Sequence, residues 1–224
     1  MTTPHWGYAT AMMGPKLFCF GGQDDNGSPL DTVQVLDTDE DVKGWETVCS
    51  MSTPKMSCGV VEHGGQFYIF GGKTRDEDED YLASAEVFDP VCNQWEVLPN
   101  MANARIMPSV SVLGGKIVVA CGFDHGGRMQ SVESFDPKTQ TWDTLPDMAH
   151  LSGRVISVAH NGFLHVKKWL PIAYEDKMER FDGRKWEEVS VTDCRISSMH
   201  LVKKEHISAL KSRKSSPSPQ LMMT

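Results

Sequence analysis

The sequence predicts an all-β fold made of about four antiparallel units with four strands each, and three observations carry this prediction. Short runs rich in Val, Ile, Phe and Tyr are separated by turn residues about every 8 to 12 positions, a spacing too short for ordinary helices. An apolar strand that ends in glycine recurs at 50-residue intervals, as "KLFCFGG" ending at Gly22, "QFYIFGG" ending at Gly72 and "KIVVACG" ending at Gly122. Tryptophan recurs at similar intervals of 50, 47 and 44 residues, at Trp45, Trp95, Trp142 and Trp186.

The first two strands of a unit are expected to form a tight hairpin. The segments "HGGQ" at 63–66, "LGGK" at 113–116 and "HNGF" at 160–163 supply the positive-φ residues that such a turn demands. The second strand then ends in glycine, where the backbone can turn sharply or be approached closely. These structural glycines are Gly21, Gly22, Gly71, Gly72 and Gly122.

The third and fourth strands are expected to form a second hairpin. In "SAEVFDP" and "SVESFDP" the proline fixes φ at the turn, and a tryptophan follows a few residues later. Because the tryptophans recur regularly, we interpret them as core residues rather than as a ligand site.

A four-stranded meander of this kind has two apolar faces and cannot bury them alone, so neighbouring units must stack radially as the blades of a β-propeller. The predicted units are 1–50, 51–100, 101–147 and a degenerate fourth unit, 148–202. In this fourth unit Lys168 and Trp169 replace the paired glycines, so we expect a distorted blade. Residues 203–224 form a basic tail rich in serine and proline, which is expected to be disordered.

These motifs together resemble Kelch repeats. The glycine pair, the Phe-Asp-Pro turn, the tryptophan, the segments "LPNM" and "LPDM" and a basic residue beyond the methionine recur in order over residues 1 to about 200. The resemblance is strongest to the Kelch domain of BTB-Kelch proteins, whose propellers usually close with about five to seven blades. Since the sequence opens on a repeat boundary and degenerates after Trp186, we expect a partial propeller from a truncated isoform or partial gene model. A complete four-bladed propeller is the alternative.

Composition narrows the classes of partner. The net charge is −8, and about −12 over residues 1–202 once the basic tail is set apart. An acidic body repels nucleic acid and anionic lipid, so neither is expected as a partner.

The first residues lack the pattern of a secretory signal and no apolar run could cross a bilayer, so we expect a cytoplasmic protein. The six cysteines show no zinc-like spacing, and we expect reduced, packed thiols and no metal or cofactor.

Arg75 and the acidic run that follows it, with Asp76 and Asp78, are the first candidates for partner binding. Its possible roles are a calcium site, a dock for a basic peptide, or solvent cover. Calcium loops alternate their ligands and place a glycine at the bend, whereas these acids are contiguous, so calcium is disfavoured.

Two further candidates lie near the ends of strands. Lys55 and Arg105 lie where one unit crosses to the next, and in the resembling family these crossings open onto the face that binds partner proteins. Arginine suits such a role because its planar fork can bind a carboxylate bidentately. The alternative is a structural bond to carbonyl groups of a neighbouring blade.

The loop "FDHGGRMQ" adds Asp124, His125 and Arg128, for which a contact surface is favoured over catalysis because no nucleophile accompanies them.

The resemblance implies a non-catalytic protein-interaction domain that recognises substrates for a cullin-type ubiquitin ligase. The cullin itself would be reached only through a BTB segment, which this chain does not contain. Association with actin or the cytoskeleton is a second possibility, since some Kelch proteins show it. The third is a Kelch-like enzyme, such as a sialic acid epimerase or a galactose oxidase type, whose copper is held by tyrosines and histidines. The four tyrosines here show no such paired arrangement.

Overall fold

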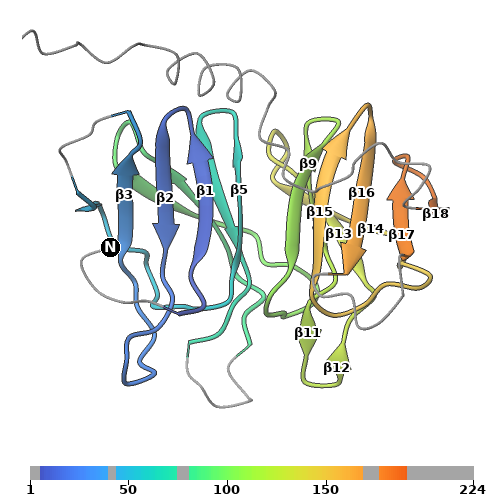
Figure 1. Cartoon of the computed structure of the whole chain (residues 1–224), viewed down its shortest axis with the longest axis horizontal. Coiled ribbons are helices and arrows are strands. Elements are labelled where there is room, and N and C mark those ends of the chain that lie inside the picture. The colour runs from blue at the N-terminus through green and yellow to red at the C-terminus, as the bar shows by residue number, and fades with distance from the viewer. Residues whose placement is uncertain (1–5, 40–43, 75–80, 169–176, 191–224) are drawn as a thin grey trace, which may run out of the picture. The chain divides into compact units, whose positions relative to one another are not determined.

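The computed structural model describes residues 6–39, 44–74, 81–168 and 177–190, all of which belong to one compact unit, Met1–Ser190. The tail 203–224 and Trp169 lie outside the described residues. Among the described residues, the strands form four antiparallel sheets of four strands each and one two-stranded hairpin (Figure 1). The prediction of four four-stranded blades is therefore confirmed.

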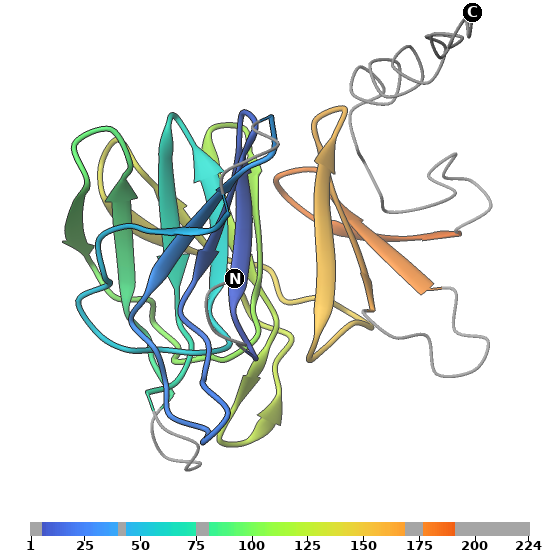
Figure 2. The same cartoon turned by 60° about the vertical axis from the view of Figure 1, so that its left-hand side comes forward.

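Each sheet is formed by consecutive segments of the chain, and we number the sheets as blades 1 to 4 (Figure 2). Blade 1 contains β1 (Ala9–Met13), β2 (Lys16–Phe20), β3 (Val33–Asp37) and β4 (Glu46–Thr47). Blade 2 contains β5 (Gly59–His63), β6 (Gln66–Phe70), β7 (Ala85–Asp89) and β8 (Gln94–Leu98). Blade 3 contains β9 (Ser109–Leu113), β10 (Lys116–Ala120), β13 (Val132–Asp136) and β14 (Thr141–Leu145). Blade 4 contains β15 (Val155–His160), β16 (Phe163–Lys168), β17 (Lys177–Phe181) and β18 (Trp186–Ser190).

Local turn chemistry sets the register of each blade. In blade 2, His63 pairs with Gln66, and the two glycines between them have φ values of +65° and +83°. At the second turn, a carboxylate oxygen of Asp89 accepts hydrogen bonds from the amides of Val91 and Cys92. Both hairpins therefore follow from residues within a few positions of the turn.

The blades pack through their faces, and the first strands lie side by side, β1 beside β5, β5 beside β9 and β9 beside β15. We term the face of a blade that packs on the preceding blade its leading face, and the opposite face its trailing face. Alternation along each strand sends successive side chains to opposite faces. Apolar residues from the trailing face of one blade and the leading face of the next form three cores, between blades 1 and 2, 2 and 3, and 3 and 4.

The four repeat tryptophans are half-buried, and those of blades 2 to 4 lie on the leading faces. Trp95 stacks on Phe88 of its own blade with 4.8 Å between ring centroids, and its edge meets Phe20 of blade 1. Trp142 meets Phe70 of blade 2 at 5.5 Å, and its indole nitrogen donates to the carbonyl oxygen of Pro99 at 2.8 Å. The tryptophans thus join each blade to the one before it.

The glycine pairs mark a close approach between two backbone segments. Gly71 and Gly72 have φ values of +64° and +97°, a region that L side chains rarely adopt. A Cβ atom on Gly71 would collide with the carbonyl oxygen of Arg105, and one on Gly72 would lie 2.7 Å from the carbonyl oxygen of Met56. The crossing to the next blade therefore runs directly against the end of the second strand.

Blade 4 departs from the others in chemistry rather than in strand pairing. β15 and β16 pair over six consecutive positions, so the expected distortion is not seen in the described strands. Its trailing face carries His165 and Arg180, which pair across strands, where blades 1 and 2 carry apolar residues.

In the described part of the chain no helix is long and apolar enough to span a membrane.

Candidate partner-binding face and central cavity

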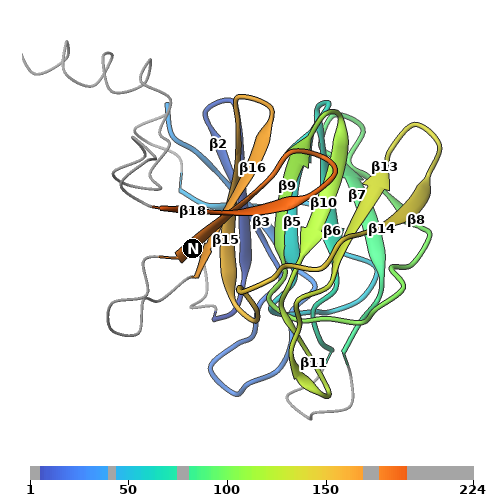
Figure 3. The ribbon, with the colours of Figure 1, turned by 90° about the vertical axis from the view of Figure 1, so that its right-hand side faces the viewer.

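The connections between second and third strands gather at one end of the blades, which we call the loop face. In each of blades 1 to 3 this connection bonds to the crossing that leads to the next blade. The amides of Gly22, Gly72 and Gly122 donate to the carbonyl oxygens of Lys55, Arg105 and Gly153, at 3.0, 2.9 and 3.0 Å. The hairpin of β11 (Phe123–Asp124) and β12 (Gly127–Arg128) projects from this end (Figures 1 and 3).

Lys55 is buried in the crossing from blade 1 to blade 2, and Arg105 is buried in the crossing from blade 2 to blade 3. The ammonium group of Lys55 lies 2.6 Å from Oε1 of Glu86, and the guanidinium of Arg105 lies 2.6 Å from Oε1 of Glu133. The two basic side chains are 1% and 0% exposed. Neither therefore presents its charge to a partner in this structure, and both tie a crossing to the third strand of the blade that follows.

The carbonyl bonds of Arg105 match the structural alternative weighed from the sequence. Its guanidinium also donates to the carbonyl oxygens of Cys121 and Ser131, at 2.9 and 3.0 Å. In blade 4 the equivalent carboxylate, Glu179, accepts hydrogen bonds from the amides of Ala149, His150 and Leu151 at 2.7 to 3.0 Å. A buried carboxylate thus recurs in the third strand of blades 2, 3 and 4, and the groups that bond to it differ from blade to blade.

The other sequence candidates separate into described and undescribed residues. Arg75, Asp76 and Asp78 lie outside the described residues. Asp124 is half-buried and accepts a hydrogen bond from the amide of Gly126 at 2.8 Å, which closes the hairpin turn. His125 and Arg128 are exposed on the same hairpin.

Tyr81 is a residue of the loop face that sequence reasoning missed. Its ring stacks on the imidazole of His125 with 4.6 Å between centroids and 9° between planes. This contact joins the loop of blade 2 to the hairpin of blade 3. Its only sequence signal is a lone aromatic residue at the end of a charged run.

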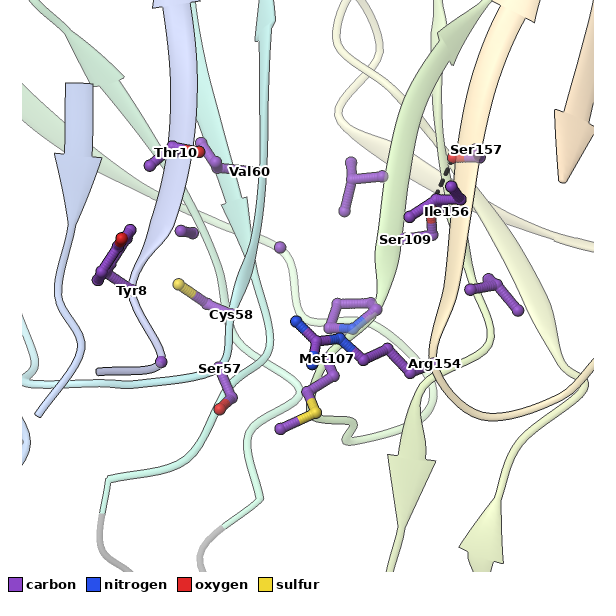
Figure 4. Close-up of a pocket in the computed structure, with 16 residues that line it drawn as sticks. Tyr8, Thr10, Ser57, Cys58, Val60, Met107, Ser109, Arg154, Ile156 and Ser157 are labelled. Carbon is purple, nitrogen blue, oxygen red and sulfur yellow. Dashed lines mark hydrogen bonds between the residues drawn. The ribbon is translucent and has the colours of Figure 1, made fainter. Parts of the chain in front are cut away.

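A cavity of about 460 Å³ lies where the first strands of all four blades converge (Figure 4). Polar groups line much of it, and Ser157 bonds to the hydroxyls of both Ser109 and Ser111 at 2.6 Å. In blades 1 to 3 a residue with positive φ lies just before the first strand, namely Gly7, Ser57 and Met107. Their backbones are linked, since Ser57 donates to Gly7 and Met107 donates to Ser57, both at 2.7 Å.

The cavity offers little for acid–base or nucleophilic chemistry. Of the sixteen residues that line it, the ionisable ones are Tyr8, Cys58 and Arg154, with no carboxylate or imidazole among them. Burial raises the pKa of the Cys58 thiol to about 11, so this cysteine is not an activated nucleophile. Within the described ranges, no three His, Cys, Asp or Glu side chains form a group that could hold a metal ion.

Comparisons with known proteins agree with this architecture. Residues 2–167 match the model of the KLHDC2/KLHL20/DRC7 Kelch-repeats domain. Alpha-scruin of Limulus polyphemus is 27% identical over 110 residues, which is 47% of this chain and 12% of that protein. Kelch-like protein 23 of Homo sapiens is 30% identical over 101 residues, which is 45% of this chain and 16% of that protein.

Solved structures give the same fold at lower sequence similarity. The structure of YjhT is matched with a TM-score of 0.66 and 16% identity, over 87% of this chain and 69% of that one. The curated relatives are much longer than the segment they share with this chain. Since the family model covers most of the sequence and the blades have the predicted form, the chain belongs to the Kelch-repeat family.

Proposed function

We propose that this chain is a non-catalytic protein-interaction domain that binds its partner at the loop face. The observation that carries the proposal is the stacking of Tyr81 on His125, which joins loops from two blades into one surface beside Asp124 and Arg128. Loops held by a rigid scaffold are the usual place for recognition. The lining of the central cavity is consistent with this reading, because it includes no carboxylate or imidazole.

The partner contacts are assigned to the exposed members of this surface. His125 and Arg128 present donors to the solvent, and Asp124 keeps a second carboxylate oxygen beyond the one that closes the turn. Arg75, Asp76 and Asp78 remain proposed contacts from the sequence. Lys55 and Arg105 act instead by holding the crossings that support the loops.

The finer function proposed is substrate recognition for a cullin-type ubiquitin ligase. It is supported by the similarity to Kelch-like protein 23 and by the match to the Kelch-repeats model. In this role the chain would hold a substrate, and a BTB segment would be needed to deliver it. The alternative is association with actin filaments, as in some Kelch proteins, and the similarity to alpha-scruin keeps it open.

Affinity capture with the full chain tests the loop face. We expect Arg128→Ala and His125→Ala to lose a specific partner, whereas Lys138→Ala, an exposed charge on the β13–β14 turn, should retain it. Equal recovery by all three variants would contradict the proposed face.

Two further assays separate the finer roles. A substrate should become ubiquitinated in a cullin-dependent reaction when the chain is fused to a BTB segment. Co-sedimentation with actin filaments that is lost in Arg128→Ala would instead favour the cytoskeletal role.

A further inference from the structure

Equivalent positions in blades 1 to 3 show a substitution that leaves space between blades 3 and 4. The central position of the second strand on the trailing face is Phe18 in blade 1, Tyr68 in blade 2 and Val118 in blade 3. The equivalence follows from the register, since these residues pair with Val35, Val87 and Ser134 of the third strand.

In the first two interfaces the ring at this position fills the space against the next blade. Phe18 packs on Phe67 with 4.5 Å between ring centroids, and Tyr68 packs on Phe135 at 6.4 Å. At the third interface Val118 lacks a ring, and Ser134 replaces the valine beside it. Two smaller side chains thus stand where a ring and a valine stand in the earlier blades.

A slot of about 350 Å³ lies beside Val118 and Ser134. Its apolar wall is made by Leu113, Val118, Leu145 and Phe181. Ser134 lies in the lining, and so does the ion pair between Lys116 and Asp143, whose side chains are 43% and 57% exposed. An apolar slot with a few polar groups is typical of a binding site.

Residues at the β9–β10, β15–β16 and β17–β18 turns line the slot. The β9–β10 and β15–β16 turns lie at the end of the blades opposite β11 and β12 (Figure 1). Gly114, Gly162 and Gly183 line it, and a Cβ built on any of these glycines would meet nothing within 4 Å. The backbone of another chain can therefore come close to the slot. This opening favours a side chain carried by a protein over a ligand that must be enclosed.

We propose that this slot binds an aromatic side chain of a protein partner, in the place that Phe18 and Tyr68 fill within the chain itself. A phenyl ring would pack on Phe181 and Val118, and a phenol hydroxyl would find Ser134 or Asp143 in the lining. The site is distinct from the loop face, and it adds a second contact to the proposed interaction domain.

The test uses the purified full chain and two probes, p-cresol and a blocked five-residue peptide with one central tyrosine among alanines. We expect both to bind weakly, with Kd on the order of millimolar, and to shift the amide NMR signals of Val118, Ser134 and Gly162. Val118→Phe gives blade 3 the phenyl ring that blade 1 has at the equivalent position, Phe18. It should weaken binding of both probes at least about ten-fold and raise Tm by about 2–4 °C, because it fills the slot.

Val97→Phe is the matched control, because Val97 is 70% exposed on blade 2 and remote from the slot. It should leave both probe binding and Tm unchanged. The proposal is overturned if neither probe binds, if Val118→Phe binds them as the unmodified chain does, or if it lowers Tm. Binding of p-cresol without the peptide would also overturn it, because the slot would then take only free aromatic molecules. None of these measurements depends on the loop face, so failure of the proposed function there would be seen separately.

Discussion

The guanidinium of Arg105 and the carboxylate of Glu133 form an ion pair at 2.6 Å in which both side chains are almost fully enclosed, at 0% and 2% exposure. The same carboxylate accepts a hydrogen bond from the amide of Ala102 at 2.7 Å. The pair thus fixes the crossing from blade 2 to blade 3 against the sheet that it enters. Removal of Arg105 would leave the buried carboxylate of Glu133 with hydrogen-bond donors from Ala102 and Asn103 but with no opposite charge beside it.

Arg105→Ala should therefore be strongly destabilising. Removing one member of a buried ion pair costs about 3–5 kcal/mol, whereas breaking an exposed pair costs about 0–1 kcal/mol. Lys116→Ala is the control, since Lys116 pairs with Asp143 at 2.7 Å on the surface. Urea unfolding monitored by tryptophan fluorescence measures both. A similar small loss in the two variants would show that Arg105 is not held as described.

Gly71→Ala should destabilise more than Gly64→Ala. Both glycines have φ near +65°, so each substitution carries the strain of a left-handed residue, about 1–3 kcal/mol. Only Gly71 faces the carbonyl oxygen of Arg105, whereas a Cβ on Gly64 meets nothing within 4 Å. The difference in unfolding free energy between the two variants measures the collision alone. Equal losses would mean that the crossing can move away.

The buried thiols should resist alkylation in the native state. Burial raises the pKa of Cys58 to about 11 and that of Cys121 to about 12, so little thiolate is present at pH 8. Among the cysteines that the structure describes, Cys92 is the exposed one and should react first with iodoacetamide. Mass spectrometry of the labelled peptides checks the order. Rapid labelling of Cys121 without loss of structure would contradict the packing between blades 3 and 4.

The same pKa shifts predict a loss of stability at high pH. In the unfolded chain a thiol ionises near pH 9.0, but in the native state Cys58 and Cys121 stay neutral until about pH 11 and 12. The two neutral thiols contribute to the stability of the native state in full below pH 9. This contribution decreases as pH rises through the native pKa values, because ionisation of the thiols favours the unfolded chain. Urea midpoints between pH 8 and 10.5 should fall less for the double variant Cys58→Ala, Cys121→Ala. An identical pH dependence would argue against buried thiols.

Replacing tryptophan by phenylalanine should cost more at Trp142 than at Trp95. The indole nitrogen of Trp142 donates to the carbonyl oxygen of Pro99, whereas that of Trp95 has no partner among the described residues. Both retain ring contacts with their own blade, so the difference reports the hydrogen bond, about 1 kcal/mol. Thermal unfolding of the two variants gives this comparison. A larger loss at Trp95 would show that ring packing dominates instead.

Residues close in sequence determined the strands and turns of this protein. The repeat of glycine and tryptophan predicted four meanders, and the hairpin at His63 to Gln66 formed with the predicted positive-φ pair. These features follow from alternation and turn chemistry, which act over a few residues and are visible in one chain. The hairpin with Asp124, His125 and Arg128 could likewise be predicted to be a loop.

Only the tertiary structure decided which charges are buried and where space remains. The sequence left open whether Lys55 and Arg105 bind a partner or bond to a neighbouring blade, because nothing near them in sequence indicates Glu86 and Glu133, which lie about thirty positions away. Tyr81 meets His125, and Val118 leaves a slot, only when the blades stand side by side. Burial and cavities depend on distant segments that fill, or fail to fill, the same volume, and a local pattern carries no information about that volume.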